Sequence, residues 1–178
     1  MNNFAEIILV ERFNKVNYYS ISVNQEQDLF YKFVAKHERT NKDKLSHIIK
    51  WLKVIGDKYG AQNQYFRNES ETADTAALPP KGKDREPVYI EIDDSGSECT
   101  VLNSLRLYCM RVSENVVFLF NGDIKTAAKA QDCDNVRPHF RLANKLSALI
   151  HKAIVEKELR WNNDCTDIVF DDSFNLIL

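Results

Sequence analysis

The residues of this chain best suited to chemistry stand close together in the sequence. They are two residues of an expected strand and two of the loop that follows it: Arg106, Tyr108, Lys125 and Lys129. Arg106 and Tyr108 lie two positions apart in the run LRLYCMRV, where an apolar residue separates them. A β-strand puts such residues on the same face, so the arginine and the tyrosine are predicted to be neighbours. Together with the two lysines they would form a basic site suited to an anionic polymer.

Each of these residues also has a purely structural explanation. An arginine and a tyrosine on one face of a strand often stack across the sheet and stabilise it. Lysines in loops are usually just solvated. The sequence leaves both explanations open for all four residues.

The elements that must position these residues are a β-hairpin and a helix. The turn Ser113-Glu114-Asn115 reverses the chain, and residues 116–120 are apolar throughout, which is typical of a strand buried on both faces. Asn121-Gly122 is predicted to end that strand. A long amphipathic helix is expected from Arg137, with these residues facing inward: Phe140, Ala143, Leu146, Ile150, Ala153 and Ile154.

The same periodicities predict the other elements. Residues 7–13 and 18–23 form an opening hairpin, and Asn24 caps a helix whose apolar stripe runs from Leu29 to His37. A second helix from about Asp43 ends at Gly56 and Gly60, and the two helices form an αα-hairpin. Residues 88–92 and 168–170 are expected to be short strands.

Two acidic segments differ in composition from the rest. Residues 67–87, with Pro79-Pro80 and Gly82, lack hydrophobic periodicity and are predicted to be a mobile acidic loop. Residues 161–178 hold four Asp and no Lys or Arg, and form an acidic C-terminal extension whose apolar end packs on the body. Because residues 101–160 carry a net charge of +4, the acidic segments are expected to limit which polyanions reach the basic sheet.

Length and composition favour a single domain over residues 1–178, since 44% hydrophobic residues can form a sizeable core. The N-terminus lacks a basic signal-peptide region, and no apolar run approaches the roughly 20 residues of a membrane span. A cytoplasmic location without membrane contact is expected. The four Cys and four His are scattered without ligand spacing, so we expect free thiols, no metal and no cofactor.

These motifs resemble the RelE/ParE toxin superfamily, in particular its HigB-like and phage Gp49-like branch. The matching pieces are LRLYCMRV with Arg106, the strand NVVFLFNG, Ile124-Lys125-Thr126 and the helix RPHFRLANKLSALI. The resemblance covers roughly residues 28–155. It implies an α+β fold, with a small antiparallel-rich sheet, an N-terminal αα-hairpin and a long C-terminal helix packed on the sheet.

The resemblance implies the toxin of a type II toxin–antitoxin system, most often an endoribonuclease that cleaves messenger RNA on the ribosome and is neutralised by a helix-turn-helix antitoxin. In such an mRNA interferase a 2′-hydroxyl attacks the adjacent phosphate, and cations must stabilise the dianion that forms. Arg106 matches the sheet arginine and Lys125 the basic loop position, while Tyr108 is the candidate proton relay. The residues expected to bind the nucleic acid backbone are Lys129, Arg111, Arg141 and Lys145.

Other functions remain open at this stage. No tyrosine or histidine follows Lys129 where members of the superfamily often carry their general acid. Relatives of the ParE type poison DNA gyrase without cutting RNA. A catalytically inert binding protein could use the same basic sheet for a protein or a nucleic acid.

Overall fold

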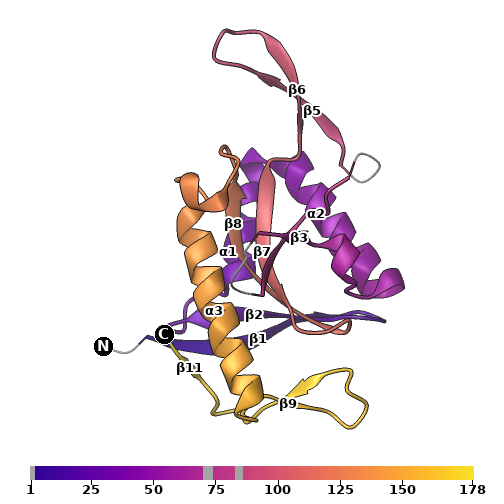
Figure 1. Cartoon of the computed structure of the whole chain (residues 1–178), viewed down its shortest axis with the longest axis vertical. Helices are drawn as coiled ribbons and strands as arrows, with labels where there is room; N and C mark the ends of the chain where they lie inside the picture. The colour runs from indigo at the N-terminus through magenta and orange to yellow at the C-terminus, as the bar shows by residue number, and fades with distance from the viewer. Residues whose placement is uncertain (1–2, 70–73, 83–85) are drawn as a thin grey trace.

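A mixed seven-stranded sheet forms the middle layer of the protein (Figure 1). The computed structural model describes residues 3–69, 74–82 and 86–178. The strands, in their order across the sheet, are β11 (Leu176–Ile177), β1 (Phe4–Arg12), β2 (Asn17–Val23), β8 (Val116–Ile124), β7 (Leu105–Arg111), β4 (Thr75–Leu78) and β3 (Arg67–Asn68). Neighbouring strands are antiparallel except β2 and β8, which run parallel.

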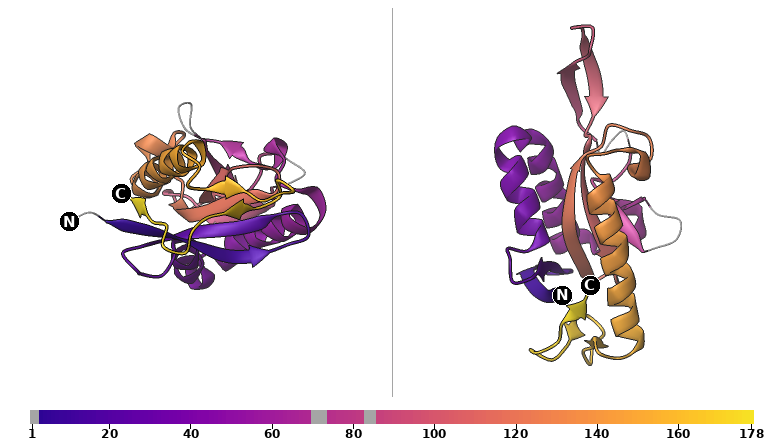
Figure 2. Two further views of the ribbon diagram at one scale, coloured as in Figure 1. Left: turned by 90° about the horizontal axis from the view of Figure 1, so that it is seen from below. Right: turned by 90° about the vertical axis from the view of Figure 1, so that its left-hand side faces the viewer.

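Helices cover both faces of this sheet. The αα-hairpin of α1 (Leu29–Thr40) and α2 (Lys42–Val54) lies on one face, and α3 (Arg137–Val155) lies on the other (Figure 2). A π-helical turn (Ile55–Tyr59) extends α2 and ends at Gly60, and two short 3-10 helices span Asn63–Tyr65 and Ala130–Asp132. The α+β class, the αα-hairpin and the long helix against the sheet agree with the prediction. None of the helices in the described part of the chain combines the length and apolar composition that a membrane span needs.

β8 is buried on both faces, as its uninterrupted apolar run predicts. Val116, Phe118 and Phe120 belong to the core beneath α3, whereas Val117 and Leu119 belong to the core beneath α1 and α2. The sheet therefore separates two hydrophobic cores. β7 lies next to β8 and is also buried on both faces, because helices cover both of them.

The prediction that Asn121-Gly122 ends this strand is wrong. β8 continues through Gly122, which lies opposite Leu107 where the β7–β8 register is irregular. A Cβ added at Gly122 would lie 1.8 Å from the carbonyl oxygen of Arg106. The glycine therefore allows two backbones to approach closely at a bulge, and it does not mark the end of pairing.

The start of α1 also differs from the prediction. Asp28 caps the helix, because its carboxylate accepts a hydrogen bond of 3.0 Å from the backbone N–H of Tyr31. Asn24 instead has a φ of 53° and lies in the turn after β2. His37 packs its ring against that of Phe33 in the same helix, with the ring centroids 5.0 Å apart. His37 is 1% exposed.

The prediction of a mobile loop over residues 67–87 is wrong for much of the segment. Arg67–Asn68 and Thr75–Leu78 are strands β3 and β4, and β4 pairs with β7 along its whole length. Ala77, Leu78 and the two prolines after them are buried. Residues 70–73 and 83–85 of the predicted loop lie outside the described residues.

A second, two-stranded sheet stands away from the body. It consists of β5 (Val88–Ile92) and β6 (Glu98–Leu102), which pair antiparallel and extend beyond the start of α2 (Figure 1). The strand predicted over residues 88–92 has the same bounds as β5, whereas β6 is not predicted. We call residues 88–102 the protruding hairpin.

The acidic tail, residues 161–178, packs its apolar end on the body as predicted. β11 pairs with β1 at the edge of the sheet, Leu176 is 4% exposed, and Phe174 packs on the core beneath α3. β9 (Arg160–Trp161) and β10 (Ile168–Val169) form a small sheet beyond the end of α3 (Figure 1). The tail is held at this end by Asp167, which accepts a hydrogen bond of 2.7 Å from the hydroxyl of Tyr19 and pairs with Arg12.

Asp167→Asn is expected to lower the free energy of unfolding by about 1–2 kcal/mol at neutral pH, because it replaces a charged acceptor that Tyr19 and Arg12 share. Burial alone would raise the pKa of Asp167, but the hydrogen bond from Tyr19 and the pairing with Arg12 outweigh burial and lower this pKa. A carboxylate with a lowered pKa stabilises the folded protein above its ordinary pKa of about 3.9. Urea unfolding at several pH values should therefore show the difference between wild type and variant vanishing as the pH falls through the lowered pKa. Asp172→Asn, at an exposed position of the same tail, should have no such effect.

Candidate anion-binding cleft

A polar cleft of about 1040 Å³ opens between the β3 edge of the sheet, the loop after β8 and the first turns of α3. Five cationic side chains and one carboxylate line it: Arg67, Lys81, Arg106, Lys125, Lys129 and Glu69. Phe140 and Asn144 of α3 form one wall. The cleft therefore has a marked excess of positive charge, and its volume lies at the upper end of the range of small-molecule sites.

Arg106 projects from β7 into this cleft. Its side chain is only 11% exposed, and its Nη1 donates hydrogen bonds to the carbonyl oxygens of Asn103 and, at 3.1 Å, of Leu105. Its Nε lies 3.7 Å from Oε1 of Glu69 and makes no hydrogen bond within the described residues. Burial lowers the pKa of the Arg106 guanidinium, and the charge of Glu69 opposes this shift. The backbone thus fixes one edge of the guanidinium, and its Nε–H, buried beside Glu69, has no hydrogen-bond partner among the described residues.

Lys125 reaches the same carboxylate from the loop after β8. Its Nζ lies 2.8 Å from Oε2 of Glu69, and its backbone N–H donates a hydrogen bond of 2.8 Å to the carbonyl oxygen of Ser104. Arg106 and Lys125 therefore flank Glu69, which is 9% exposed. The predicted pair of cations does meet, and it meets around a carboxylate from the segment expected to be a loop.

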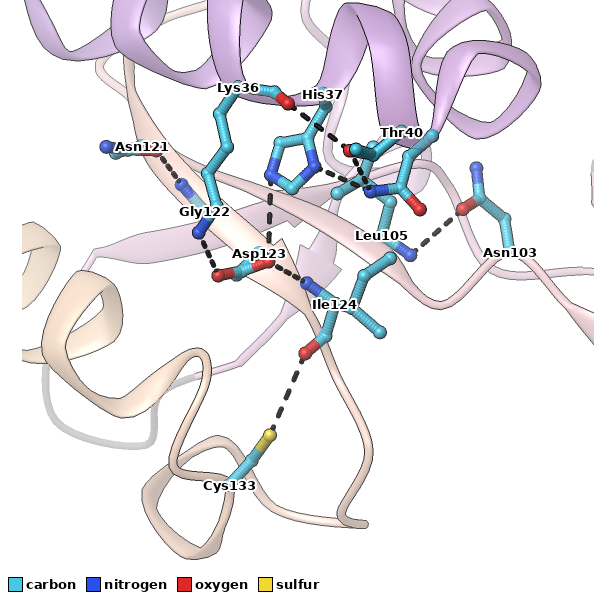
Figure 3. A network of polar contacts seen from close by, with 11 residues as sticks. Lys36, His37, Thr40, Asn103, Leu105, Asn121, Gly122, Asp123, Ile124 and Cys133 are labelled. Carbon is cyan, nitrogen blue, oxygen red and sulfur yellow. Dashed lines mark hydrogen bonds and ion pairs between the residues drawn. The ribbon is translucent and has the colours of Figure 1, made fainter. Parts of the chain in front are cut away.

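A network on the neighbouring residues fixes the backbone that carries Lys125 (Figure 3). Asp123 accepts a hydrogen bond of 2.8 Å from the N–H of Ile124 and pairs with Lys36 and His37 of α1. On the other side, the thiol of Cys133 lies 3.9 Å from the carbonyl oxygen of Ile124 and accepts a hydrogen bond of 3.3 Å from the N–H of Thr126. Contacts on both sides of position 125 thus hold the lysine in place.

Arg67 adds a second buried guanidinium near Arg106. It pairs with the buried carboxylate of Glu86 and donates a hydrogen bond of 2.7 Å to the carbonyl oxygen of Pro79. Burial and the nearby charge of Arg106 lower the pKa of Arg67 to about 10. Because like charges oppose one another here, an anion bound between them would be favoured.

Tyr108 shares the face of β7 with Arg106, as predicted, but the expectation that it takes part in proton transfer does not fit its position. α3 covers this face, so Tyr108 is 0% exposed and its ring packs on Phe140 with centroids 5.6 Å apart. Its hydroxyl has no hydrogen-bond partner among the described residues, and burial raises its pKa. Tyr108 supports the wall of the cleft and does not line it.

Tyr108→Phe is therefore expected to keep or slightly raise stability, because it removes a buried hydroxyl that has no hydrogen-bond partner among the described residues, and to leave RNA binding and cleavage of the kind that the sequence predicts within about twofold of wild type. Thermal unfolding and a cleavage assay on the same preparation measure both effects. A large loss of rate with unchanged stability would restore the tyrosine to the chemistry.

The other predicted nucleic-acid-binding residues fall in three places. Lys129 lines the cleft. Arg111 points to the opposite face of the sheet, where its Nε donates a hydrogen bond to the carbonyl oxygen of Ala61. Arg141 and Lys145 are exposed on α3 one position after the two residues that line the cleft, so they flank it without lining it.

Sequence reasoning missed Glu69, Arg67 and Lys81, because they belong to the segment expected to be a loop. β3 has two residues and β4 has four, too few for a period of two to stand out. The only available signal was the four-residue apolar run AALP beside these charged residues.

The expected repulsion of polyanions by the acidic tail does not fit the position of the tail. The residues that line the cleft include the first turns of α3. The tail runs beyond the end of α3 around β9 and β10 before β11 returns alongside the helix (Figure 1). Asn144 and the C-cap Glu156 of α3 are twelve positions apart, which gives a rise of about 18 Å, whereas the Debye length at physiological salt is about 8 Å. The tail carboxylates are therefore largely screened from the cleft.

The reactive groups outside the cleft are less suited to a functional site. The thiol of Cys133 would have its pKa raised by burial, but hydrogen bonds from the side chain and backbone of Thr126 lower it to about 7, while the residue itself is 1% exposed. Within residues 3–69, 74–82 and 86–178, His, Cys, Asp and Glu form no group of three that could hold a metal ion.

Comparison of the chain with protein-family models, curated proteins and solved structures gave no match.

Proposed function

We propose that this cleft binds the phosphate backbone of RNA and that the chain is the toxin of a type II toxin–antitoxin system, cleaving messenger RNA on the ribosome until a helix-turn-helix antitoxin neutralises it. The observation that carries the proposal is the placement of Arg106 and Lys125 on either side of Glu69, at 3.7 and 2.8 Å. A cation pair on rigid backbone beside one carboxylate meets the needs of phosphate transesterification.

In the proposed reaction the RNA 2′-oxygen attacks the adjacent phosphorus, forming the O2′–P bond while the P–O5′ bond breaks. Glu69 accepts the 2′-hydroxyl proton, water donates a proton to the departing 5′-oxygen, and Glu69 then returns its proton to the resulting hydroxide, which restores the carboxylate and the water. Arg106 and Lys125 stabilise the negative charge that develops on the phosphorane oxygens. Lys129 holds a neighbouring phosphate. The products are a 2′,3′-cyclic phosphate and a 5′-hydroxyl.

The order of the elements supports the same proposal. Two helices precede the strands that build the cleft, the β7–β8 hairpin carries Arg106 on its first strand, Lys125 follows its second strand, and α3 closes the sheet. The resemblance to the RelE/ParE superfamily implies this order. Fold alone does not assign an activity, so the cleft residues carry the argument.

Expression of the chain in bacteria tests the proposal. Induction should arrest growth, and mapping of RNA ends should show new 5′-hydroxyl termini in translated messages. Intact transcripts together with double-strand DNA breaks would instead support gyrase poisoning. Normal growth despite good soluble expression would indicate that the chain is a binding protein without toxic activity.

Two substitutions in the cleft separate binding from cleavage. Lys125→Ala should slow cleavage about tenfold or more, a rise in the barrier of about 1.4 kcal/mol, and should weaken RNA binding as well. Glu69→Gln should also slow cleavage about tenfold, yet bind RNA as tightly as wild type or more tightly, because it removes a negative charge beside the phosphate. Single-turnover cleavage and binding isotherms measure the two effects. Lys58→Ala, an exposed lysine outside the cleft, is the matched control.

A further inference from the structure

The protruding hairpin has two faces of different character. Tyr89, Glu91, Cys99 and Val101 form an inner face that is partly buried. Lys44 of α2 ties this face to the body, because its Nζ pairs with Glu91 and lies 5.6 Å from the ring centroid of Tyr89. The alternating residues form an outer face that points away from these contacts.

The outer face is mostly apolar and exposed, with Thr100 and Glu98 as its two polar residues. Val88 and Leu102 lie opposite each other at its base and are 58% and 49% exposed, and Ile90 and Ile92 toward the tip are 71% and 73% exposed. These are four of the eleven large apolar residues exposed in the described part of the chain. Such side chains gathered on one face mark an interaction site more often than scattered ones do.

The hairpin projects from the body (Figures 1 and 2), and the four apolar side chains of its outer face remain about half exposed or more. An isolated two-stranded hairpin is marginally stable in water, because it lacks a further layer to bury its apolar face. In this protein Lys44 secures only the inner face. A partner on the outer face would provide the missing layer.

The charge around the outer face indicates the chemistry of that partner. Residues 87–102 contain four carboxylates and no lysine or arginine. Asp93 and Asp94 lie at the tip, and Glu98 lies on the outer face opposite Ile92. The carboxylate of Asp93 accepts hydrogen bonds of 2.9 and 3.0 Å from the N–H groups of Ser95 and Ser97, and hydrogen bonds from Ser95 and Ser97 lower its pKa. The apolar face is thus bordered by negative charge at neutral pH.

We propose that the outer face of the protruding hairpin docks a polypeptide segment of a partner protein whose apolar side chains lie beside lysines or arginines. The apolar side chains pack on Ile90 and Ile92, and the cations reach Asp94 and Glu98. Nucleic acid is repelled by this charge, and a second copy of the chain would bring a face with the same negative charge against it. The proposal rests on different residues from those of the cleft and does not depend on RNA cleavage.

Binding of a labelled amphipathic peptide of leucine and lysine to the full chain tests the proposal, with a peptide of leucine and glutamate in the same pattern as the probe of opposite charge. Fluorescence anisotropy should show binding of the lysine peptide, weakening as salt screens the charges, and about tenfold or more weaker binding of the glutamate peptide. The double variant Ile90→Thr/Ile92→Thr keeps β-branched residues and should lose about tenfold or more in affinity.

Two further variants keep the test decisive. Asp94→Asn/Glu98→Gln leaves the apolar face and the Asp93 turn intact and should reduce both the affinity and its salt dependence. Val155→Thr/Val169→Thr removes two exposed apolar residues from the far end of the protein and should bind like wild type. Equal binding of both peptides, binding that survives both hairpin variants, or a dimer in sedimentation that Ile90→Thr/Ile92→Thr dissociates would each overturn the proposal, the last by showing a second copy as the occupant.

Discussion

Arg106→Ala is expected to lower the rate of the proposed RNA cleavage by about a hundredfold or more and to relieve the proposed growth arrest. Removing one fixed donor from an oxyanion-stabilising site typically costs about 10²–10³ in rate, or about 2.7–4 kcal/mol. Arg106 fits that role because its Nη1 is anchored to backbone carbonyls while its Nε faces Glu69 without a hydrogen bond among the described residues. Its position is therefore set before any substrate binds. Single-turnover cleavage of a messenger RNA in a translating extract measures the effect.

Two control variants test whether the position and the planar shape of the Arg106 side chain are responsible for the effect. Arg111→Ala removes an arginine from the same strand, but its side chain lies on the opposite face of the sheet, so cleavage should persist. Arg106→Lys keeps the charge and loses the planar fork, so its rate should fall between those of wild type and alanine. Full activity of a folded Arg106→Ala protein would remove the arginine from the mechanism.

Gly122→Ala is expected to lower the free energy of unfolding by about 3 kcal/mol or more. The added Cβ would lie 1.8 Å from the carbonyl oxygen and 2.8 Å from the carbonyl carbon of Arg106, and both are backbone atoms that cannot rotate away. β7 and β8 would have to separate at the centre of the sheet, where both strands are buried on both faces. Overpacking of this kind typically costs about 1–3 kcal/mol even where side chains can adjust. Urea unfolding followed by circular dichroism gives the value.

Gly96→Ala is the matched control for this prediction. Gly96 has a φ of 81° at the tip of the protruding hairpin, and no atom lies within 4 Å of a Cβ added there. Its substitution should cost only the backbone strain, about 1–2 kcal/mol, and should not change the cleft. If the two variants were equally stable, close approach of the backbones would not be the reason for a glycine at position 122. The clash of the added Cβ is with the backbone carbonyl of Arg106. The folded fraction of Gly122→Ala should therefore also be slower in the proposed RNA cleavage.

Elements with long, regular residue patterns are predictable from the sequence. The three-four period of α2 and α3 identified both helices and their inward faces, and the apolar run of residues 116–120 identified a strand buried on both sides. The period of two placed Arg106 and Tyr108 on one face of β7. Such patterns are local, and they are strong because each buried residue repeats the same signal.

Packing between parts of the chain that are far apart in sequence sets what covers each face and which distant residues meet. Periodicity showed that Arg106 and Tyr108 share a face, but the packing of α3 on that face buries Tyr108 and leaves Arg106 at the edge of a cleft. Glu69 meets Lys125 across 56 positions of sequence through the pairing of β3 and β4 beside β7. Strands of two and four residues carry almost no periodic signal, and their position is set by hydrogen bonds to strands far away in the sequence. The choice of glycine at position 122 has the same origin, since the backbone that it must accommodate belongs to another strand.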